Sequence, residues 1–320
     1  MSVGKDFIGP YQLLRMISAR SSTQVWEAVR SGEQKRIALK VLTSRFRKDK
    51  KEIAQLKHEA KIGKLLRHEN VIEIYDYYDE TGIPLISMEL FHAVNVKISI
   101  RERREELLPI LTPLIRQCVL GLKEMHDKGW VHCDVKPDNF LADDKGLVKL
   151  IDFSIGRKIK AGGLAGLFGG KTKAIQGTRS YMAPEQIRQK APDARTDIYG
   201  LGCMIFELMS GRLPYTGNSP DQLLTRHLTA SIPSLESCSD ASSDFAKLVK
   251  KMLAKKPENR FQSMADFLGV FERCQMFRSG NAPKVSLARA GQYANRFSTH
   301  FESKIPLQKH SSHHLASRQS

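Results

Sequence analysis

The sequence lacks the features of a membrane-spanning, secreted or disulfide-bonded protein. None of its apolar runs reaches the roughly 18–20 residues that a membrane helix requires. The most apolar stretch, residues 198–209, contains Glu207 and is expected to form a buried core helix, so we expect no membrane span. Residues 1–6 have no apolar segment, so no secretory signal is expected. The five cysteines are dispersed without CxxC spacing, which predicts reduced thiols in a cytoplasmic protein and neither a disulfide framework nor a zinc site.

Positive charge, in contrast, is abundant, with a formal net charge of +17. Basic residues concentrate in residues 45–67, in residues 157–173 and toward the C-terminal end. Such a surface can attract acidic peptides, nucleic acid or anionic lipid, although solvated lysines on helix faces are the simpler interpretation. Because no basic motif with interleaved aromatic residues is present, we expect no nucleic-acid partner. Protein partners of acidic character stay open.

The most informative segment is HCDVKPDN at residues 132–139, followed by an aspartate and a phenylalanine at 152–153. Phosphoryl transfer requires a carboxylate to orient the attacking hydroxyl, cations to neutralise phosphate oxygens, and oxygen ligands for Mg²⁺. Asp134 fits the first requirement and Lys136 the second. Asn139 and Asp152 fit the third, because Mg²⁺ prefers hard oxygen ligands and takes few of them from protein. The segment therefore predicts a site for phosphoryl transfer.

These residues resemble the catalytic loop (HRDxKxxN) and the DFG motif of the eukaryotic-type, or Hanks-type, serine/threonine protein kinase family. Further matches follow in the family's order. They are residues 36–42, which carry Lys40 and resemble the VAIK strand, Glu59 at the spacing of the glutamate that pairs with this lysine, residues 177–185 ending in APE, Asp197, and Arg260. Together they cover about residues 11–273. Lys136 resembles the serine/threonine class and not the tyrosine class, and the segments at 181–186 and 196–202 are similar to bacterial members.

The hydrophobic pattern indicates a small β-rich lobe followed by a larger helical lobe, and the resemblance implies that they form the α+β, two-lobed protein kinase fold. Alternating strands are expected over residues 11–41, with a helix at 48–67, two further strands at 71–78 and 84–90, and helices from 107 onward. A small lobe with an antiparallel β-sheet and one main helix would occupy residues 11–91, and a larger, mainly helical lobe residues 92–273. An N-terminal extension (1–10) and a basic, flexible C-terminal tail (274–320) would flank this domain.

The resemblance implies ATP and Mg²⁺ as cofactors and serine- or threonine-bearing proteins as substrates, with autophosphorylation left open. Asp134 would be the catalytic base, Lys136, Asn139 and Thr178 would complete the catalytic group, and Asn139 and Asp152 would bind the metal. Thr178 would contact the aspartate–lysine pair. The ATP-binding residues would be Ile17, Val25, Ala38, Lys40, Glu59, Met88, Glu89, Phe91 and Leu141.

Several positions depart from the family pattern, the most prominent of them in the loop that covers the phosphates. Ser18, Arg20 and Thr23 stand where the family has three glycines. Glycine permits unusual backbone angles there and lets backbone N–H groups approach phosphate. Its loss should stiffen the loop and weaken nucleotide binding by degrees, although Arg20 could supply positive charge.

Three further departures concern mobility and regulation. Ser154 follows Asp152-Phe153 in place of glycine and should limit backbone flips of that motif. Gly63 falls where the family has a bulky residue, which predicts a packing gap and an easily displaced helix. Cys133 replaces an arginine that commonly pairs with a phosphate on the activation segment, so activation by that route is in doubt.

Two function classes follow from these residues. The first is an active serine/threonine kinase, supported by the complete set of predicted catalytic residues. The alternative is a pseudokinase or weakly active scaffold, supported by the missing glycines. A third interpretation, a nucleic-acid-associated protein, rests on charge alone.

Overall fold

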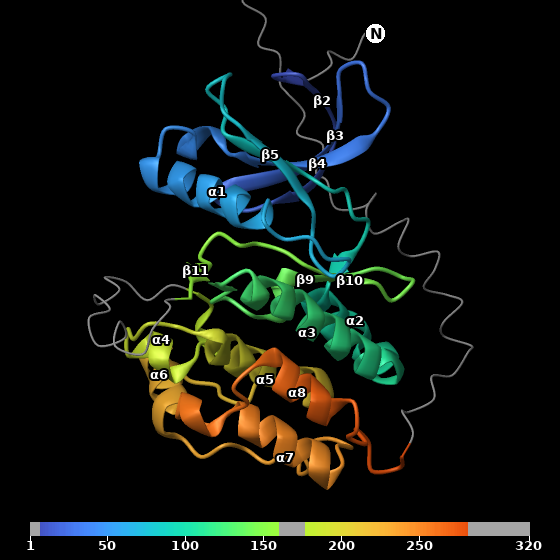
Figure 1. Cartoon of the computed structure of the whole chain (residues 1–320), viewed down its shortest axis with the longest axis vertical. Coiled ribbons are helices and arrows are strands. Elements are labelled where there is room, and N and C mark those ends of the chain that lie inside the picture. The colour runs from blue at the N-terminus through green and yellow to red at the C-terminus, as the bar shows by residue number, and fades with distance from the viewer. Residues whose placement is uncertain (1–6, 160–176, 281–320) are drawn as a thin grey trace, which may run out of the picture. The chain divides into compact units, whose positions relative to one another are not determined.

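The computed structural model describes residues 7–159 and 177–280. The chain begins with a curled antiparallel sheet of six strands in the order β1-β2-β3-β4-β6-β5 (Figure 1). These strands are β1 (Phe7–Ile8), β2 (Tyr11–Ala19), β3 (Thr23–Arg30), β4 (Arg36–Leu42), β5 (Ile74–Tyr78) and β6 (Leu85–Met88). The single long helix of this lobe, α1 (Lys50–Gly63), packs against β5 and β6. This arrangement matches the predicted small lobe.

Helix α1 begins where the sequence supplies a capping residue. Asp49 has extended backbone angles, and its carboxylate accepts hydrogen bonds from the N–H groups of Lys51 at 2.8 Å and Glu52 at 3.2 Å. Such a cap satisfies backbone donors that lack a partner within the helix. Leu56 and Ile62 lie on the buried face of α1. The cap and this apolar face fix the helix against the sheet.

The remainder of the described chain is mainly helical (Figure 1). Its helices are α2 (Val96–Leu107), α3 (Leu111–Asp127), α4 (Pro184–Ile187), α5 (Ala194–Ser210), α6 (Pro220–Thr229), α7 (Ser243–Met252) and α8 (Met264–Phe271). Short 3₁₀ turns occur at η1 (Ser44–Phe46), η2 (Leu108–Ile110), η3 (Pro137–Asn139), η4 (Arg179–Tyr181) and η5 (Pro257–Asn259). Among the described helices, none is both long and apolar enough to cross a membrane.

Helix α5 lies at the centre of the helical lobe, as predicted for its apolar sequence. Every residue from Thr196 to Ser210 is buried. Asp193 caps its first turn, and Gly211 ends it with a left-handed φ of +72°, an angle that favours glycine. Because α3 and α7 both pack on α5, this helix gives the lobe a rigid interior.

Two small β-structures lie next to the predicted catalytic segment. β7 (Val94–Asn95), β9 (Phe140–Ala142) and β10 (Val148–Leu150) form one sheet, and β8 (Trp130–Val131) pairs with β11 (Arg157–Lys158). A turn at residues 143–146 joins β9 to β10, with Gly146 at φ +84°. These pairings hold both ends of the predicted catalytic segment, residues 132–139.

Some predicted boundaries differ from those in the structure. Helix α2 begins at Val96, well before residue 107, and its charged sequence hides the few buried positions that define its inner face. The strand expected at 71–78 starts only at Ile74, and Val71 makes a single bridge to Leu150.

The two ends of the folded region also extend beyond the predicted domain. Phe7–Ile8 pairs with β2 although it was expected in the N-terminal extension. Met276 and Phe277 are buried although they were assigned to the tail, because Phe277 bridges to Ala241. The rest of the predicted tail and the glycine-rich segment at 160–176 lie outside the described residues.

The predicted packing gap at Gly63 is wrong. Gly63 is the last residue of α1, and a Cβ atom there would lie 2.3 Å from Cδ1 of Ile74. Ile74, in β5, is only 1% exposed. Its side chain fills the space beside the glycine, so the absence of a side chain at residue 63 permits close packing.

We therefore predict that Gly63→Ala lowers the free energy of unfolding by about 1–3 kcal/mol, the usual cost of overpacking. Gly269 in α8 is the matched control, because a Cβ atom there would have no neighbour within 4 Å. Gly269→Ala should raise stability by up to about 1 kcal/mol through helix propensity. Chemical denaturation of both variants tests this, and equal stability of the two would contradict the packing account.

Candidate active site

Three predicted site residues gather around a fourth, Asp134: Lys136 and Asn139 from the predicted catalytic segment (residues 132–139), and Thr178. Lys136 Nζ donates to Asp134 Oδ2 at 2.6 Å and to Thr178 Oγ1 at 2.6 Å. The backbone N–H of Thr178 donates to Asp134 Oδ1 at 2.8 Å. Asn139 Nδ2 donates to the carbonyl oxygen of Asp134 at 2.9 Å. Asn139 Nδ2 also lies 3.3 Å from Asp134 Oδ2, so three residues hold the Asp134 side chain, which remains 15% exposed.

The position of this loop depends on a buried aspartate at the start of α5. Asp197 accepts hydrogen bonds from the backbone N–H groups of His132 at 2.8 Å and Cys133 at 2.9 Å. It also lies 2.8 Å from His126 Nε2 of α3. Cys133 has a left-handed φ of +69°, which is strained for a residue other than glycine. The two hydrogen bonds to Asp197 stabilise that backbone conformation.

A second charged group lies between the sheet and Asp152. Lys40 Nζ donates to both carboxylate oxygens of Glu59, at 2.8 and 2.6 Å, and lies 3.7 Å from Asp152 Oδ1. These charges come from β4, α1 and the segment after β10. Burial alone raises the pKa of Asp152, but Lys40, Ser154 and Arg20 outweigh it and hold the pKa well below its usual value. Asp152 is therefore a carboxylate across the ordinary pH range.

The conformation around Asp152 is fixed by its neighbours. Asp152 has φ +66°, and Ser154 Oγ donates to its Oδ1 at 2.7 Å. Phe153 is fully buried, with its ring edge-on to that of His132 at 6.1 Å between centroids. The Ser154 hydroxyl thus makes a contact that glycine could not make.

The predicted adenine-side residues lie on several strands. Val25 pairs with Lys40, and Ala38 pairs with Met88, across neighbouring strands. Ile17 lies at an irregularity in β2. Leu141 lies in β9 of the other lobe.

A backbone hydrogen bond, an ion pair and a cation–π contact hold the segment after β6. Glu89 donates its backbone N–H to the carbonyl of Glu73 at 2.8 Å, and its carboxylate lies 3.0 Å from Lys149 Nζ. Lys149 also lies over the ring of Phe91, 5.6 Å from its centroid. No sequence pattern predicted this role of Lys149.

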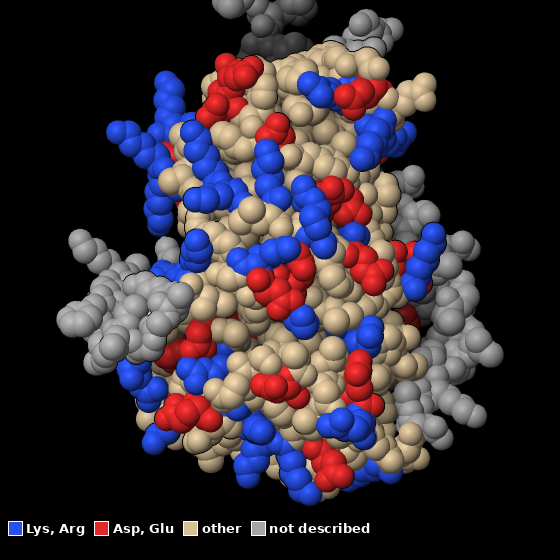
Figure 2. Space-filling view, viewed as in Figure 1, with Lys and Arg blue, Asp and Glu red and all other residues tan. Residues whose placement is uncertain are grey.

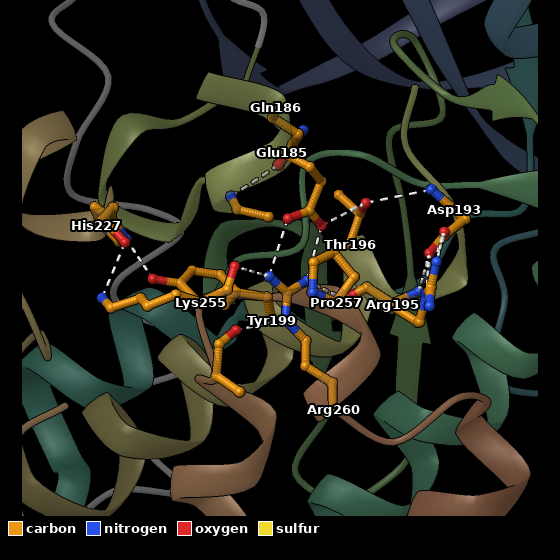
Figure 3. Close-up of polar contacts among 12 residues, drawn as sticks. Glu185, Gln186, Asp193, Arg195, Thr196, Tyr199, His227, Lys255, Pro257 and Arg260 are labelled. Carbon is orange, nitrogen blue, oxygen red and sulfur yellow. Dashed lines mark hydrogen bonds and ion pairs between the residues drawn. The ribbon is translucent and has the colours of Figure 1, made fainter. Parts of the chain in front are cut away.

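The segment that carries Thr178 is fixed at its far end by a buried ion pair (Figure 3). Arg260 donates to the two carboxylate oxygens of Glu185 at 2.8 and 2.9 Å. Thr196 Oγ1 donates to the same carboxylate at 2.9 Å, and Arg260 also donates to the carbonyls of Arg195 and Ala254, each at 2.8 Å. The Arg260 side chain is completely buried. These bonds join α4 and α5 to the turn before α8.

Sequence reasoning missed two contacts of the site. His126 was not recognised as a partner of Asp197, and His58 Nε2 lies 2.7 Å from the carbonyl oxygen of Gly156. The second contact joins α1 to the segment that follows Asp152. A histidine directly before Glu59 was the only available signal, and histidine is too common on helices to be informative by itself.

The geometry agrees with a comparison against known protein families. The family model for the protein kinase domain matches residues 11–268. The chain belongs to the protein kinase family. The two-lobed α+β fold of this family, predicted from the sequence, is thereby confirmed together with the resemblance.

Individual relatives of this kinase domain are bacterial proteins. It is 29% identical over 267 residues to serine/threonine-protein kinase PrkC of Bacillus subtilis, covering 83% of this chain and 40% of that protein. It is 32% identical over 254 residues to serine/threonine-protein kinase PknB of Mycobacterium tuberculosis, covering 78% of this chain and 40% of that protein. For PknL of the same organism the identity is 29%, with 78% and 62% covered. The chain thus spans less than half the length of the first two relatives.

We predict that Arg260→Met lowers the free energy of unfolding by about 3–5 kcal/mol, because it leaves the Glu185 carboxylate buried without its partner. The double variant Arg260→Met/Glu185→Met should recover part of this loss. Lys123→Met is the control, since its ion pair with Asp127 is exposed and such pairs contribute less than about 1 kcal/mol. Urea denaturation measures all three, and a double variant as unstable as Arg260→Met would argue against an unpaired buried charge.

Proposed function

We propose that the chain is an ATP-dependent serine/threonine protein kinase in which Asp134 is the catalytic base. The supporting observation is the fixed carboxylate of Asp134, which is bonded to Lys136 and Thr178 and yet partly exposed. A serine or threonine hydroxyl oxygen would form a bond to the γ-phosphorus of ATP. The bond from that phosphorus to the bridging oxygen would break, and ADP would leave with the electron pair. Asp134 would accept the hydroxyl proton.

Asn139 and Asp152 fit the proposed magnesium site. Asn139 Oδ1 is buried and has no hydrogen-bond partner among the described residues, because the amide nitrogen is the atom held by Asp134. An unpartnered buried amide oxygen is costly unless a ligand binds it. Together with the carboxylate of Asp152 it supplies the hard oxygen ligands that Mg²⁺ prefers. When bound, the ion would neutralise charge on the phosphates.

Lys40 and Lys136 are the cations that this proposal assigns to phosphate binding. Lys40 is held between Glu59 and Asp152, so its ammonium group is fixed close to the proposed metal ligands. Lys136 is held beside Asp134, where it would neutralise the transferred phosphoryl group. Thr178 completes the group, since it orders both Asp134 and Lys136 on the substrate side.

The basic surface favours substrates with acidic segments. Lysine and arginine side chains stand close together over the start of α1, while acidic and basic side chains mix over the helical lobe (Figure 2). Arg45, Lys48, Lys50 and Lys51 are all exposed in this region. A concentration of positive charge attracts acidic partners. The free cysteines support placing this domain in a reducing compartment such as the cytoplasm.

Transfer of labelled phosphate from ATP in the presence of Mg²⁺ tests the proposal. The protein should label serine or threonine in itself, in acidic casein or in a basic histone, with casein the better acceptor. Asp134→Asn should lower the rate at least about 10²-fold, because general-base catalysis contributes about that much. Asp144→Asn, at an exposed turn position, should leave the rate unchanged.

The alternative, a pseudokinase, gives a different pattern. It would transfer no phosphate above the level of Asp134→Asn, whether or not it bound ATP. That result, or labelling confined to tyrosine, would overturn the proposed activity.

A further inference from the structure

The loop between β2 and β3 keeps a tight turn without any glycine. The N–H of Arg20 donates to the carbonyl of Thr23 at 2.8 Å, which closes the turn. None of residues 18–23, all of which are described, has a left-handed φ. The backbone angles for which glycine is needed are therefore not used here, and larger side chains fit without strain.

The same loop is also hydrogen-bonded to the residue that follows β4. Thr43 donates its backbone N–H to the carbonyl of Ser22 at 2.9 Å and its hydroxyl to the carbonyl of Ser21 at 3.2 Å. These two hydrogen bonds fix the position of the loop relative to β4. The loop backbone is consequently a defined platform from which the Arg20 side chain projects.

From this platform Arg20 reaches Asp152, 132 residues away in the sequence. Its Nη1 atom lies 3.3 Å from Asp152 Oδ2, while Ser154 Oγ and Lys40 Nζ lie nearer Oδ1, at 2.7 and 3.7 Å. The Arg20 side chain is 54% exposed and that of Asp152 is 16% exposed. Because the contact is long and the Arg20 side chain is more than half exposed, this ion pair contributes little stability. Arg20 and Asp152 can therefore each exchange this contact readily for one with a stronger ligand.

We propose that Arg20 is a phosphate-binding residue of the nucleotide site, held by Asp152 in the free protein and transferred to the phosphate oxygens when Mg²⁺ occupies Asp152. The inference rests on the proposed function, because it requires nucleotide and Mg²⁺ at this site. A guanidinium group in contact with a metal ligand lies within reach of any phosphate bound to that metal.

Arginine is well suited to this exchange. Its planar group binds phosphate through two parallel hydrogen bonds, and such charge-assisted bonds are stronger than neutral ones. Arg20 would thus replace, with one side chain, the backbone contacts that a glycine-rich loop supplies. Arg20 would thereby offset the weaker nucleotide binding that is expected from the missing glycines.

Binding measurements on the full chain test the assignment without relying on activity. The ligands are ATP, ADP and adenosine, each titrated by calorimetry with and without Mg²⁺ into the parent protein, Arg20→Ala and Arg20→Lys. Arg30→Ala is the matched control, because Arg30 is an exposed arginine of the same sheet that pairs with Glu33.

Arg20→Ala should weaken Mg²⁺-ATP binding about tenfold or more, the loss expected for a charged hydrogen bond. The adenosine affinity of Arg20→Ala should stay within about twofold of the parent. The Mg²⁺-ATP affinity of Arg20→Lys should lie between those of the parent and Arg20→Ala. Arg30→Ala should match the parent for every ligand.

Two results would overturn the assignment of Arg20. One is unchanged Mg²⁺-ATP affinity in Arg20→Ala, and the other is an equal loss for ATP and adenosine, which would indicate a purely structural effect. Failure of the proposed activity is distinguishable, because a parent protein that binds Mg²⁺-ATP but transfers no phosphate contradicts the kinase activity and leaves the Arg20 assignment to these binding measurements. A parent protein that binds no ATP contradicts both.

Discussion

The loop that carries the proposed catalytic base depends on one buried carboxylate, that of Asp197. It is almost completely shielded from solvent and accepts the backbone N–H groups of His132 and Cys133. Each of these donors would cost about 1–3 kcal/mol if buried without a partner. Asp197 belongs to α5, a helix that is buried on all sides. The loop bonded to Asp197 is therefore anchored to the core of the lobe. The position of Asp134, one residue further along, follows from this contact.

The remaining charged groups connect the sheet to that rigid base. Lys40 and Arg20 come from the small lobe, and both lie against Asp152. His58 of α1 adds a contact to the carbonyl of Gly156. The two lobes are therefore linked by charged side chains at Asp152, the proposed metal ligand. A ligand that takes over Asp152 would rearrange these links, which ties nucleotide binding to the placement of the loop that carries Arg20.

Much of this could be predicted from the sequence, and the exceptions have physical reasons. Short motifs identified the residues around Asp134, because their chemistry is local to one loop. The space beside Gly63 could not be predicted, since Ile74 fills it from a different element. Helix α2 was missed because charged residues obscure its apolar positions. The contact of Arg20 with Asp152 joins residues 132 positions apart, and no local pattern reports such a pairing.

The central claim is that Asp197 serves catalysis by positioning the loop that carries Asp134. The most direct test is Asp197→Asn, which keeps the shape of the side chain but removes the charge that binds two N–H groups. Phosphate transfer and ATP affinity should be measured on the same preparation, after thermal unfolding has shown that the variant is folded. The account predicts a loss of transfer of about 10²-fold or more with ATP affinity within about threefold of the parent, since the loss falls on general-base catalysis. Transfer at the parent rate in a folded Asp197→Asn variant would contradict it.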